Sequence, residues 1–410
     1  MNKNLRIKFS IFATYFFFAI LLNSTGVVIL LVQSFFNVAE TAASVLDPYK
    51  DLSIAFSSFI AGIFLTRIGY KKSILFSLGL TTIVCFIVPT ISTFWSIKLI
   101  CAVGGLTFGI TKVAVFGSIG LVTNSSKEHL SLMNYIEGVF MVGILFGFLI
   151  YSYMSEDVMS GRWLYTYYVI GAISFLAFIS LLFSELDESQ IQTDENSDSN
   201  DFKLMLRLVL LPTIMVFVIC AFLNVLIEQS TMNWLPTFNK KILGLSEPLA
   251  IVLGSILSGS MAVGRLLAGF VLKRIEWSKV LTGCIVGAMV VLLISMQLSK
   301  GAMSSTEITN FSDIPFVAFF FPLIGLFLSP VYPAINSIIL NSLPKKKHAA
   351  MASLIVIFSA VGGSLGSIIT GALFEHFGGI NAFYCSIIPM TLLVITLFGF
   401  KKLVGKETDF

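Results

Sequence analysis

Charged residues are scarce in this sequence. Only 12% of its 410 residues are Asp, Glu, Lys or Arg, whereas 56% are hydrophobic and 13% are aromatic. The mean hydropathy of +0.94 lies far above that of soluble domains. A soluble chain of this length would need polar faces to cover its core, so a soluble globular protein is excluded. We expect no nucleic-acid partner for such a chain.

Histidine and cysteine are also few. The three histidines are scattered, and the five cysteines each lie inside an apolar run without a CxxC pair. Metal sites draw on clusters of such residues at short spacing. We therefore expect no metal, no cofactor and no enzymatic activity, and we interpret the cysteines as small core residues.

Long apolar runs are what the sequence has in abundance. A run of about 20 residues is long enough to cross ~30 Å of hydrocarbon as a helix. We predict an all-α membrane protein with twelve transmembrane helices in two six-helix bundles. The spans fall at about 8–33, 45–66, 73–91, 96–122, 131–153, 163–183, 211–235, 248–272, 279–298, 314–340, 348–374 and 380–400.

Lysine and arginine gather on one side of these spans, at both termini and in the loops that follow the even-numbered spans. Short loops rich in these residues stay in the cytoplasm. We expect a multi-pass protein of the cell inner membrane, with both termini cytoplasmic, that acts as a monomer. The net charge of +4 follows from this bias.

One segment, 184-SELDESQIQTDENSDSNDFK-203, interrupts the apolar runs. It is acidic and too poor in apolar residues to form a core, and it divides the spans six and six. We predict an N-terminal six-helix bundle at 1–184, an acidic cytoplasmic linker at 185–206 and a C-terminal six-helix bundle at 207–410.

The two halves share a motif, 62-GIFLTRIGYKK-72 after the second span and 269-GFVLKRIEWSK-279 after the eighth. Major facilitator transporters consist of two parallel repeats of six spans, and both segments resemble that superfamily's signature between spans two and three. The resemblance implies a major facilitator fold, in which two bundles rock around a central site and the signature loops form a cytoplasmic gate. The gate residues are then Gly62, Arg67, Gly69, Arg265, Gly269 and Arg274.

The match to this signature is incomplete. Thr66 stands where the signature has aspartate, and Glu276 stands where the second copy would have glycine. The first departure removes one acidic contact of the gate but leaves its basic cluster. In an alternative interpretation, the basic residues only retain this loop in the cytoplasm, which leaves the paired glycines unexplained.

A narrower resemblance covers most of residues 225–380. The segments 264-GRLLAGFVLKRIEWSKVL-281, 325-GLFLSPVYPAINSIIL-340 and 348-HAAMASLIVIFSAVGGSLGSIITGALFEHFGG-379 resemble the fucose permease type, the fucose-galactose-glucose:proton symporter family. This resemblance implies proton-driven sugar uptake through a central cavity bordered by Gln229, Asn233 and Trp234.

The acids on which that type depends in spans one and four are missing here. The corresponding positions fall at about Gly26 and within residues 110–112. Proton coupling must then use other carboxylates, because a coupling acid has to be charged and neutralised inside the membrane. The candidates, in order, are Glu137, Asp51 and Glu228.

The second span begins with three charges. Asp47 followed by Pro48 is typical of the start of a helix, so Asp47, Lys50 and Asp51 could lie at the membrane rim, with Asp47 and Lys50 paired three residues apart. The depth of Asp51 favours a second interpretation, an outer gate or proton site, because an unpaired charge there costs at least ~2.5 to 3.5 kcal/mol.

Lys112 lies near the middle of span four, and Glu137 lies at comparable depth in span five. We expect an ion pair between them, either a static pair that fixes packing or one that substrate or proton breaks. Glu228 and Arg265 are candidates for function as ionisable groups inside spans. Pro330 and Pro333 should kink span ten, and the glycines at 362–366 should allow close helix contact.

These observations predict a secondary active transporter that takes up a small polar solute by proton coupling and alternating access. A sugar is the first candidate for that solute. An exporter of drugs or metabolites on the same fold remains the alternative. The expected partners are the solute, protons and the lipid bilayer. Polar side chains can hydrogen-bond the hydroxyls of a sugar, and an indole can stack on its ring. The substrate-binding candidates that offer such groups are Asn23, Lys112, Glu137, Gln229, Asn233, Trp234 and Asn336.

Overall fold

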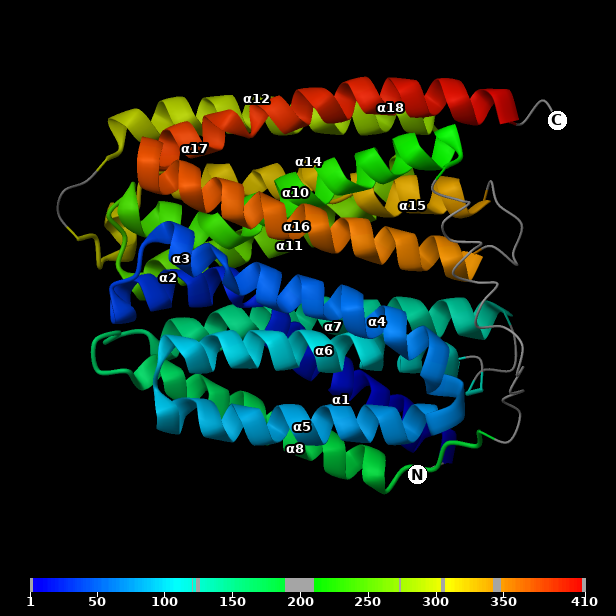
Figure 1. Cartoon of the computed structure of the whole chain (residues 1–410). Coiled ribbons are helices and arrows are strands. Elements are labelled where there is room, and N and C mark those ends of the chain that lie inside the picture. The colour runs from blue at the N-terminus through cyan, green and yellow to red at the C-terminus, as the bar shows by residue number, and fades with distance from the viewer. Residues whose placement is uncertain are drawn as a thin grey trace. The chain divides into compact units, whose positions relative to one another are not determined.

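The computed structural model describes residues 3–119, 121–122, 126–188, 210–272, 274–303, 307–341 and 348–407, in which the named elements are α-helices and short 3-10 turns. The chain divides into two compact units. Unit 1 is Met1–Val38 with Leu46–Asn196, and unit 2 is Ala39–Val45 with Ser197–Phe410. The helices of each unit run side by side (Figure 1). The predicted linker, from residue 189 onward, lies outside the described ranges.

Unit 1 contains α1 (Lys3–Asn23), α2 (Thr25–Phe36), α4 (Leu46–Ile68), α5 (Tyr70–Ile91), α6 (Phe94–Ile119), α7 (Ser126–Met154), the 3-10 turn η1 (Arg162–Tyr165) and α8 (Thr166–Leu182). The first predicted span is interrupted between α1 and α2 at Ser24. The hydroxyl of Ser24 donates to the carbonyl of Ile20 at 2.6 Å. The remaining predicted spans of this half each correspond to one long helix, with η1 preceding α8.

Two glycines bring α6 close to α4. A Cβ at Gly105 would meet the backbone carbonyl of Lys50, and one at Gly109 would meet the hydroxyl of Ser57. Small residues four apart on one helix face permit such approach between membrane helices. The first turns of α4, with their charges, are therefore held against the middle of α6.

Unit 2 contains α3 (Glu40–Ser44), α10 (Pro212–Lys241), α11 (Glu247–Val271), α12 (Trp277–Gly301), η2 (Phe311–Asp313), α13 (Val317–Phe320), η3 (Phe321–Leu323), α14 (Ile324–Leu328), α15 (Val331–Asn341), α16 (His348–Phe377), α17 (Gly379–Cys385) and α18 (Ile387–Glu407). Predicted span ten is broken into several pieces, and α14 ends just before Pro330. Proline lacks the N–H that would continue the ladder, so the predicted kink is confirmed.

The glycines of 362–366 confirm the predicted close contact. Cβ atoms at Gly362 and Gly366 would meet the carbonyls of Phe222 and Leu226 on α10. The α10–α16 pair in unit 2 is therefore packed as closely as the α4–α6 pair in unit 1.

The short helix α3 comes from the first half of the sequence but packs in unit 2, along α16. Glu40 forms an ion pair with Lys241 of α10. The backbone N–H and the hydroxyl of Thr41 donate to Glu375 of α16, at 3.1 and 2.6 Å. Hydropathy alone did not predict that this segment of the first half packs in unit 2.

Ten helices in the described part of the chain are long and apolar enough to cross a membrane. The two remaining predicted spans are α4, which begins with the charges at 47, 50 and 51, and α7, whose apolar part is Val139–Met154. The predicted all-α fold with twelve spans is confirmed, with α4 and α7 as the second and the fifth span.

Candidate functional site

The three charges at the start of α4 form a buried triad. Lys50 Nζ lies 3.0 Å from Asp47 Oδ1 and 3.4 Å from Asp51 Oδ1. The exposed fractions of Asp47, Lys50 and Asp51 are 0%, 5% and 8%. The three side chains are therefore shielded from solvent, and the predicted pairing of Asp47 with Lys50 is confirmed. Whether they lie at the membrane rim or deeper stays a prediction. Lys50 also reaches Asp51, which the sequence analysis did not include.

The triad has an apolar environment with a few polar groups. A cavity of about 10 Å³ beside Lys50 is lined by Thr25 of α2, Cys101 of α6 and Tyr167 of α8, among others. A space of this size is at the lower limit for a single water molecule. Two carboxylates and one ammonium leave the triad one negative charge in excess when all are ionised, and burial makes that charge costly. A single proton on Asp51 would neutralise the triad.

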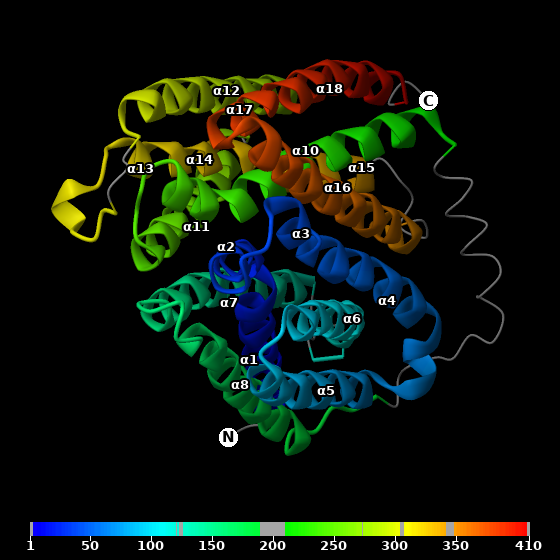
Figure 2. The same cartoon turned by 60° about the vertical axis from the view of Figure 1, so that its left-hand side comes forward.

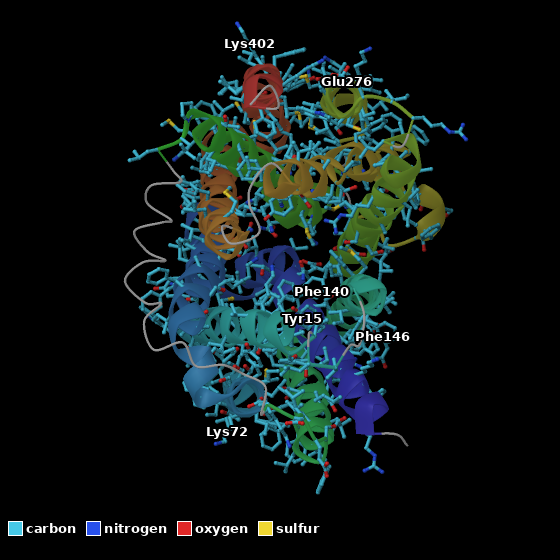
Figure 3. The ribbon with its side chains drawn as sticks, turned by 90° about the vertical axis from the view of Figure 1, so that its right-hand side faces the viewer. Tyr15, Lys72, Phe140, Phe146, Glu276 and Lys402 are labelled. Carbon is cyan, nitrogen blue, oxygen red and sulfur yellow. The ribbon has the colours of Figure 1, made fainter. Side chains whose placement is uncertain are left out.

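A second feature of unit 1 is Lys112 in an aromatic cluster. Its Nζ lies 5.9 Å from the ring centre of Phe108 and 6.0 Å from that of Phe116, one turn before and after it on α6. Tyr15 of α1 contacts both rings, and Phe140 of α7 contacts Tyr15 at 6.0 Å between ring centres. Figure 3 shows Tyr15 and Phe140 lying together. Aromatic faces attract a cation in this way.

The expected pair between Lys112 and Glu137 stays a prediction. Glu137 belongs to α7, but its side chain is outside the described residues, as are Arg67, Gly62 and Gly269. Asn23 is partly buried at the end of α1, where its side-chain amide donates to the carbonyl of Ala19 at 3.2 Å.

Unit 2 has a polar cluster around Glu228 of α10. Arg265 of α11 approaches it, with Nη2 3.7 Å from Glu228 Oε1, and Asn224 Nδ2 lies 3.4 Å from the other carboxylate oxygen. Arg265, one of the expected gate residues, thus lies beside Glu228 in the α10–α11 pair, and its role in a gate stays a prediction. Its Nε and the Oδ1 of Asn224 are buried without a hydrogen-bond partner among the described residues.

The same cluster extends to α15 and α16. Tyr332 lies within electrostatic reach of Glu228 and Arg265, and its hydroxyl is 3.0 Å from the hydroxyl of Ser359. Asn336 lies one turn further along α15, and its buried Oδ1 has no partner in the described part of the chain. Buried polar atoms without partners are uncommon, so this cluster has hydrogen-bonding capacity that a solute could use.

Three other predicted binding residues lie on α10. Trp234 is fully buried, its Nε1 donates to the carbonyl of Ser367 at 3.1 Å, and its ring packs on Phe374. In this structure the indole therefore fixes α10 to α16 and offers no face to a solute. Asn233 is buried, and Gln229 is partly exposed.

The two copies of the signature loop differ for a conformational reason. Gly69 has φ +96°, a region that favours glycine. Glu276, at the matching position, has φ −55° and precedes α12, so no glycine is needed there. Hydrogen bonds from Lys401, at 2.5 Å, and from Ser278 hold the pKa of Glu276 below its ordinary value. Arg274 is exposed in this connection.

Glu188 is a residue of this region that the sequence analysis missed. Its carboxylate accepts the backbone N–H of Lys71 at 2.7 Å, in the first turn of α5, and the Nζ of Lys71 donates to the carbonyls of Leu182 and Ser184. A carboxylate at a helix N-terminus satisfies a free N–H and complements the helix dipole. The acidic run after span six was the only available signal for it.

Comparisons with known proteins find relatives that match nearly the whole chain. A Buchnera aphidicola (subsp. Schizaphis graminum) protein described as a TsgA homolog is 23% identical over 402 residues, which cover 97% of this chain and 95% of that protein. The solved D-xylose-proton symporter has a TM-score of 0.73 at 14% identity, covering 97% of each chain. The transporter FucP, solved in the outward conformation, has a TM-score of 0.63 at 18% identity, covering 98% of this chain and 99% of FucP.

These likenesses to solved structures show that this chain and FucP share a fold. The sequence model described as Major Facilitator Superfamily matches residues 11–306, more than half of the chain. The protein is thus a multi-pass membrane transporter and belongs to the Major Facilitator Superfamily.

Proposed function

We propose that this protein is a proton-coupled transporter that takes up a small polar solute across the cytoplasmic membrane by alternating access. The observation that carries the proposal is the buried triad of α4. Its excess negative charge is destabilising in a low-dielectric interior, so a proton that neutralises Asp51 alters the energy of any state in which the triad is buried. Alternating burial and hydration of Asp51 would then couple proton movement to transport.

Asp51 is the coupling group in this proposal. The described contacts support it: Lys50 at 3.4 Å keeps the carboxylate within an ion-paired network, and Asp47 supplies the competing charge. Glu228 is less suited, because Arg265 at 3.7 Å balances its charge one to one. Glu137 remains a further candidate by its depth in span five.

The solute is proposed to be a sugar or a similarly hydroxylated molecule. Within unit 2, the cluster of Glu228, Arg265 and Asn336 supplies hydrogen-bond donors and acceptors of the kind that sugar recognition requires. Within unit 1, Lys112 lies among aromatic rings, which are the faces on which sugars stack. The solved D-xylose-proton symporter shares this fold, which supports the class without identifying the solute. Both termini are proposed to be cytoplasmic and the working unit to be a monomer.

Counterflow in proteoliposomes tests the proposal. Vesicles are loaded with one unlabelled sugar, nucleoside, amino acid or organic acid at a time, and the labelled form of the same solute is added outside. The labelled solute should accumulate when it is a sugar and hardly at all when it belongs to another class. An inward proton gradient should then drive uphill uptake of the same solute, and a protonophore should abolish that uptake. Counterflow of organic acids or amino acids alone would overturn the sugar assignment, and uptake that ignores the gradient would overturn the coupling.

A further inference from the structure

Unit 1 contains a large apolar groove formed by α4, α5 and α6. Its volume is about 530 Å³, within the range of ligand pockets. Phe56 and Ile60 of α4, Phe76 of α5, and Leu106 and Ile110 of α6 line it. Lys72, in the first turn of α5, also lines it at the end where α4 passes into α5 (Figure 3).

The groove follows from how the three helices pack. α4 and α5 each pack closely on α6 and much less on each other. The glycines at 105 and 109 draw α4 onto α6, whereas α5 also packs on α8. From the turn at Gly69 the two helices diverge (Figure 2). A wedge-shaped space between them is therefore built into unit 1.

The walls of this space are apolar and accessible. Phe56 and Phe76 are each 62% exposed, and Ile60 is 37% exposed. Two hydroxyls of the described lining belong to Ser57 and Ser73, and they donate to the backbone carbonyls of Ile54 and Gly69, at 3.2 and 2.8 Å. Along its length the groove thus presents hydrocarbon, which suits an acyl chain and does not suit a polar solute.

Among the described residues that line the groove, Lys72 is the charged one. Lys72 is exposed and has no carboxylate partner among the residues that the structure describes. Its neighbour Lys71, by contrast, is held by backbone carbonyls of Leu182 and Ser184. A free ammonium at the end of an apolar groove in a membrane protein complements a phosphate at the lipid interface.

We propose that the α4–α5–α6 groove is a binding site for an anionic phospholipid, with one acyl chain between Phe56 and Phe76 and the headgroup phosphate on Lys72. The lipid comes from the leaflet at the end of unit 1 where α4 meets α5. Such a lipid fills the wedge and stabilises the divergent helices. Neither the triad nor Lys112 is among the described residues that line the groove. The lipid stays bound there and is not transported.

Native mass spectrometry of the full chain in detergent tests this site, with phosphatidylglycerol and phosphatidylcholine as probes. Wild-type protein should retain phosphatidylglycerol in preference to phosphatidylcholine. Lys72→Gln should weaken phosphatidylglycerol alone by about fivefold, the contribution of one lysine near an anionic surface. Ile60→Trp, which fills the groove at a partly exposed position, should weaken both lipids.

Matched controls separate this site from general lipid binding. Lys279→Gln removes an exposed lysine at the corresponding turn of unit 2, and Ile83→Trp enlarges an exposed residue of α5 outside the groove. Neither should alter the adducts. A phosphatidylglycerol with a photoreactive acyl chain should label residues 56–76. Equal retention of the two lipids by the wild type, labelling elsewhere, or unchanged binding in both groove variants would overturn the proposal.

Discussion

Removing Lys50 should destabilise unit 1 severely. Its Nζ contacts Asp47 at 3.0 Å and Asp51 at 3.4 Å, and all three side chains are nearly inaccessible. Lys50→Met would leave two buried carboxylates without their cation, and loss of one partner of a buried ion pair costs about 3 to 5 kcal/mol. For a unit of this size that corresponds to a fall in Tm of roughly 6 to 20 °C.

Thermal unfolding in detergent, followed by tryptophan fluorescence or aggregation, measures this effect. Lys98→Met is the control, because Lys98 lies over the rings of Phe94 and Trp95 and should cost only about 1 kcal/mol. Adding Asp47→Asn and Asp51→Asn to Lys50→Met should recover most of the loss, since no charge is then buried. The single variant should also gain stability as the pH falls, because protonation removes the charge. A fall no larger than that of the control would refute this reasoning.

Three further predictions follow from other parts of the chain. If Lys112 and Glu137 pair, Lys112→Ala should impair folding or transport, and adding Glu137→Ala to this variant should restore part of the loss. Additive effects of the two substitutions in a double-mutant cycle would exclude the pair. Glu188→Ala should cost about 1 kcal/mol by uncapping α5, seen as faster amide exchange in its first turn, and Glu188→Gln should lose less. The pKa of Glu276 is lowered, so its stabilisation should be present at neutral pH and fade as the pH falls through that pKa. Lys401→Ala should remove this pH dependence of the Tm. A pH profile of the Tm that is unchanged in this variant would contradict the pairing of Glu276 with Lys401.

Local patterns in the sequence predicted much of the fold. Hydropathy located the spans because a bilayer-crossing helix must carry a continuous apolar stretch. The ion pair of Asp47 with Lys50 was predictable because residues three apart share a helix face. The glycines at 362 and 366 likewise predicted a close contact, although not its partner α10.

Contacts between distant residues were harder to predict. The pairing of Glu228 with Arg265 depends on how α10 and α11 are rotated about their axes, which a sequence does not specify. The burial of Trp234 depends on α16 in the same way. The docking of α3 in unit 2 depends on two side-chain contacts, Glu40 with Lys241 and Thr41 with Glu375, that span most of the chain.

Transport by Asp51→Asn in proteoliposomes tests whether Asp51 couples proton movement to uptake. The solute identified by counterflow is used, with Glu276→Gln as an acid-to-amide control outside the spans. We predict that Asp51→Asn loses uphill uptake in a proton gradient and keeps solute exchange, because exchange needs binding and alternating access but no net proton movement. Gradient-driven accumulation by Asp51→Asn equal to that of the wild type would contradict this coupling role.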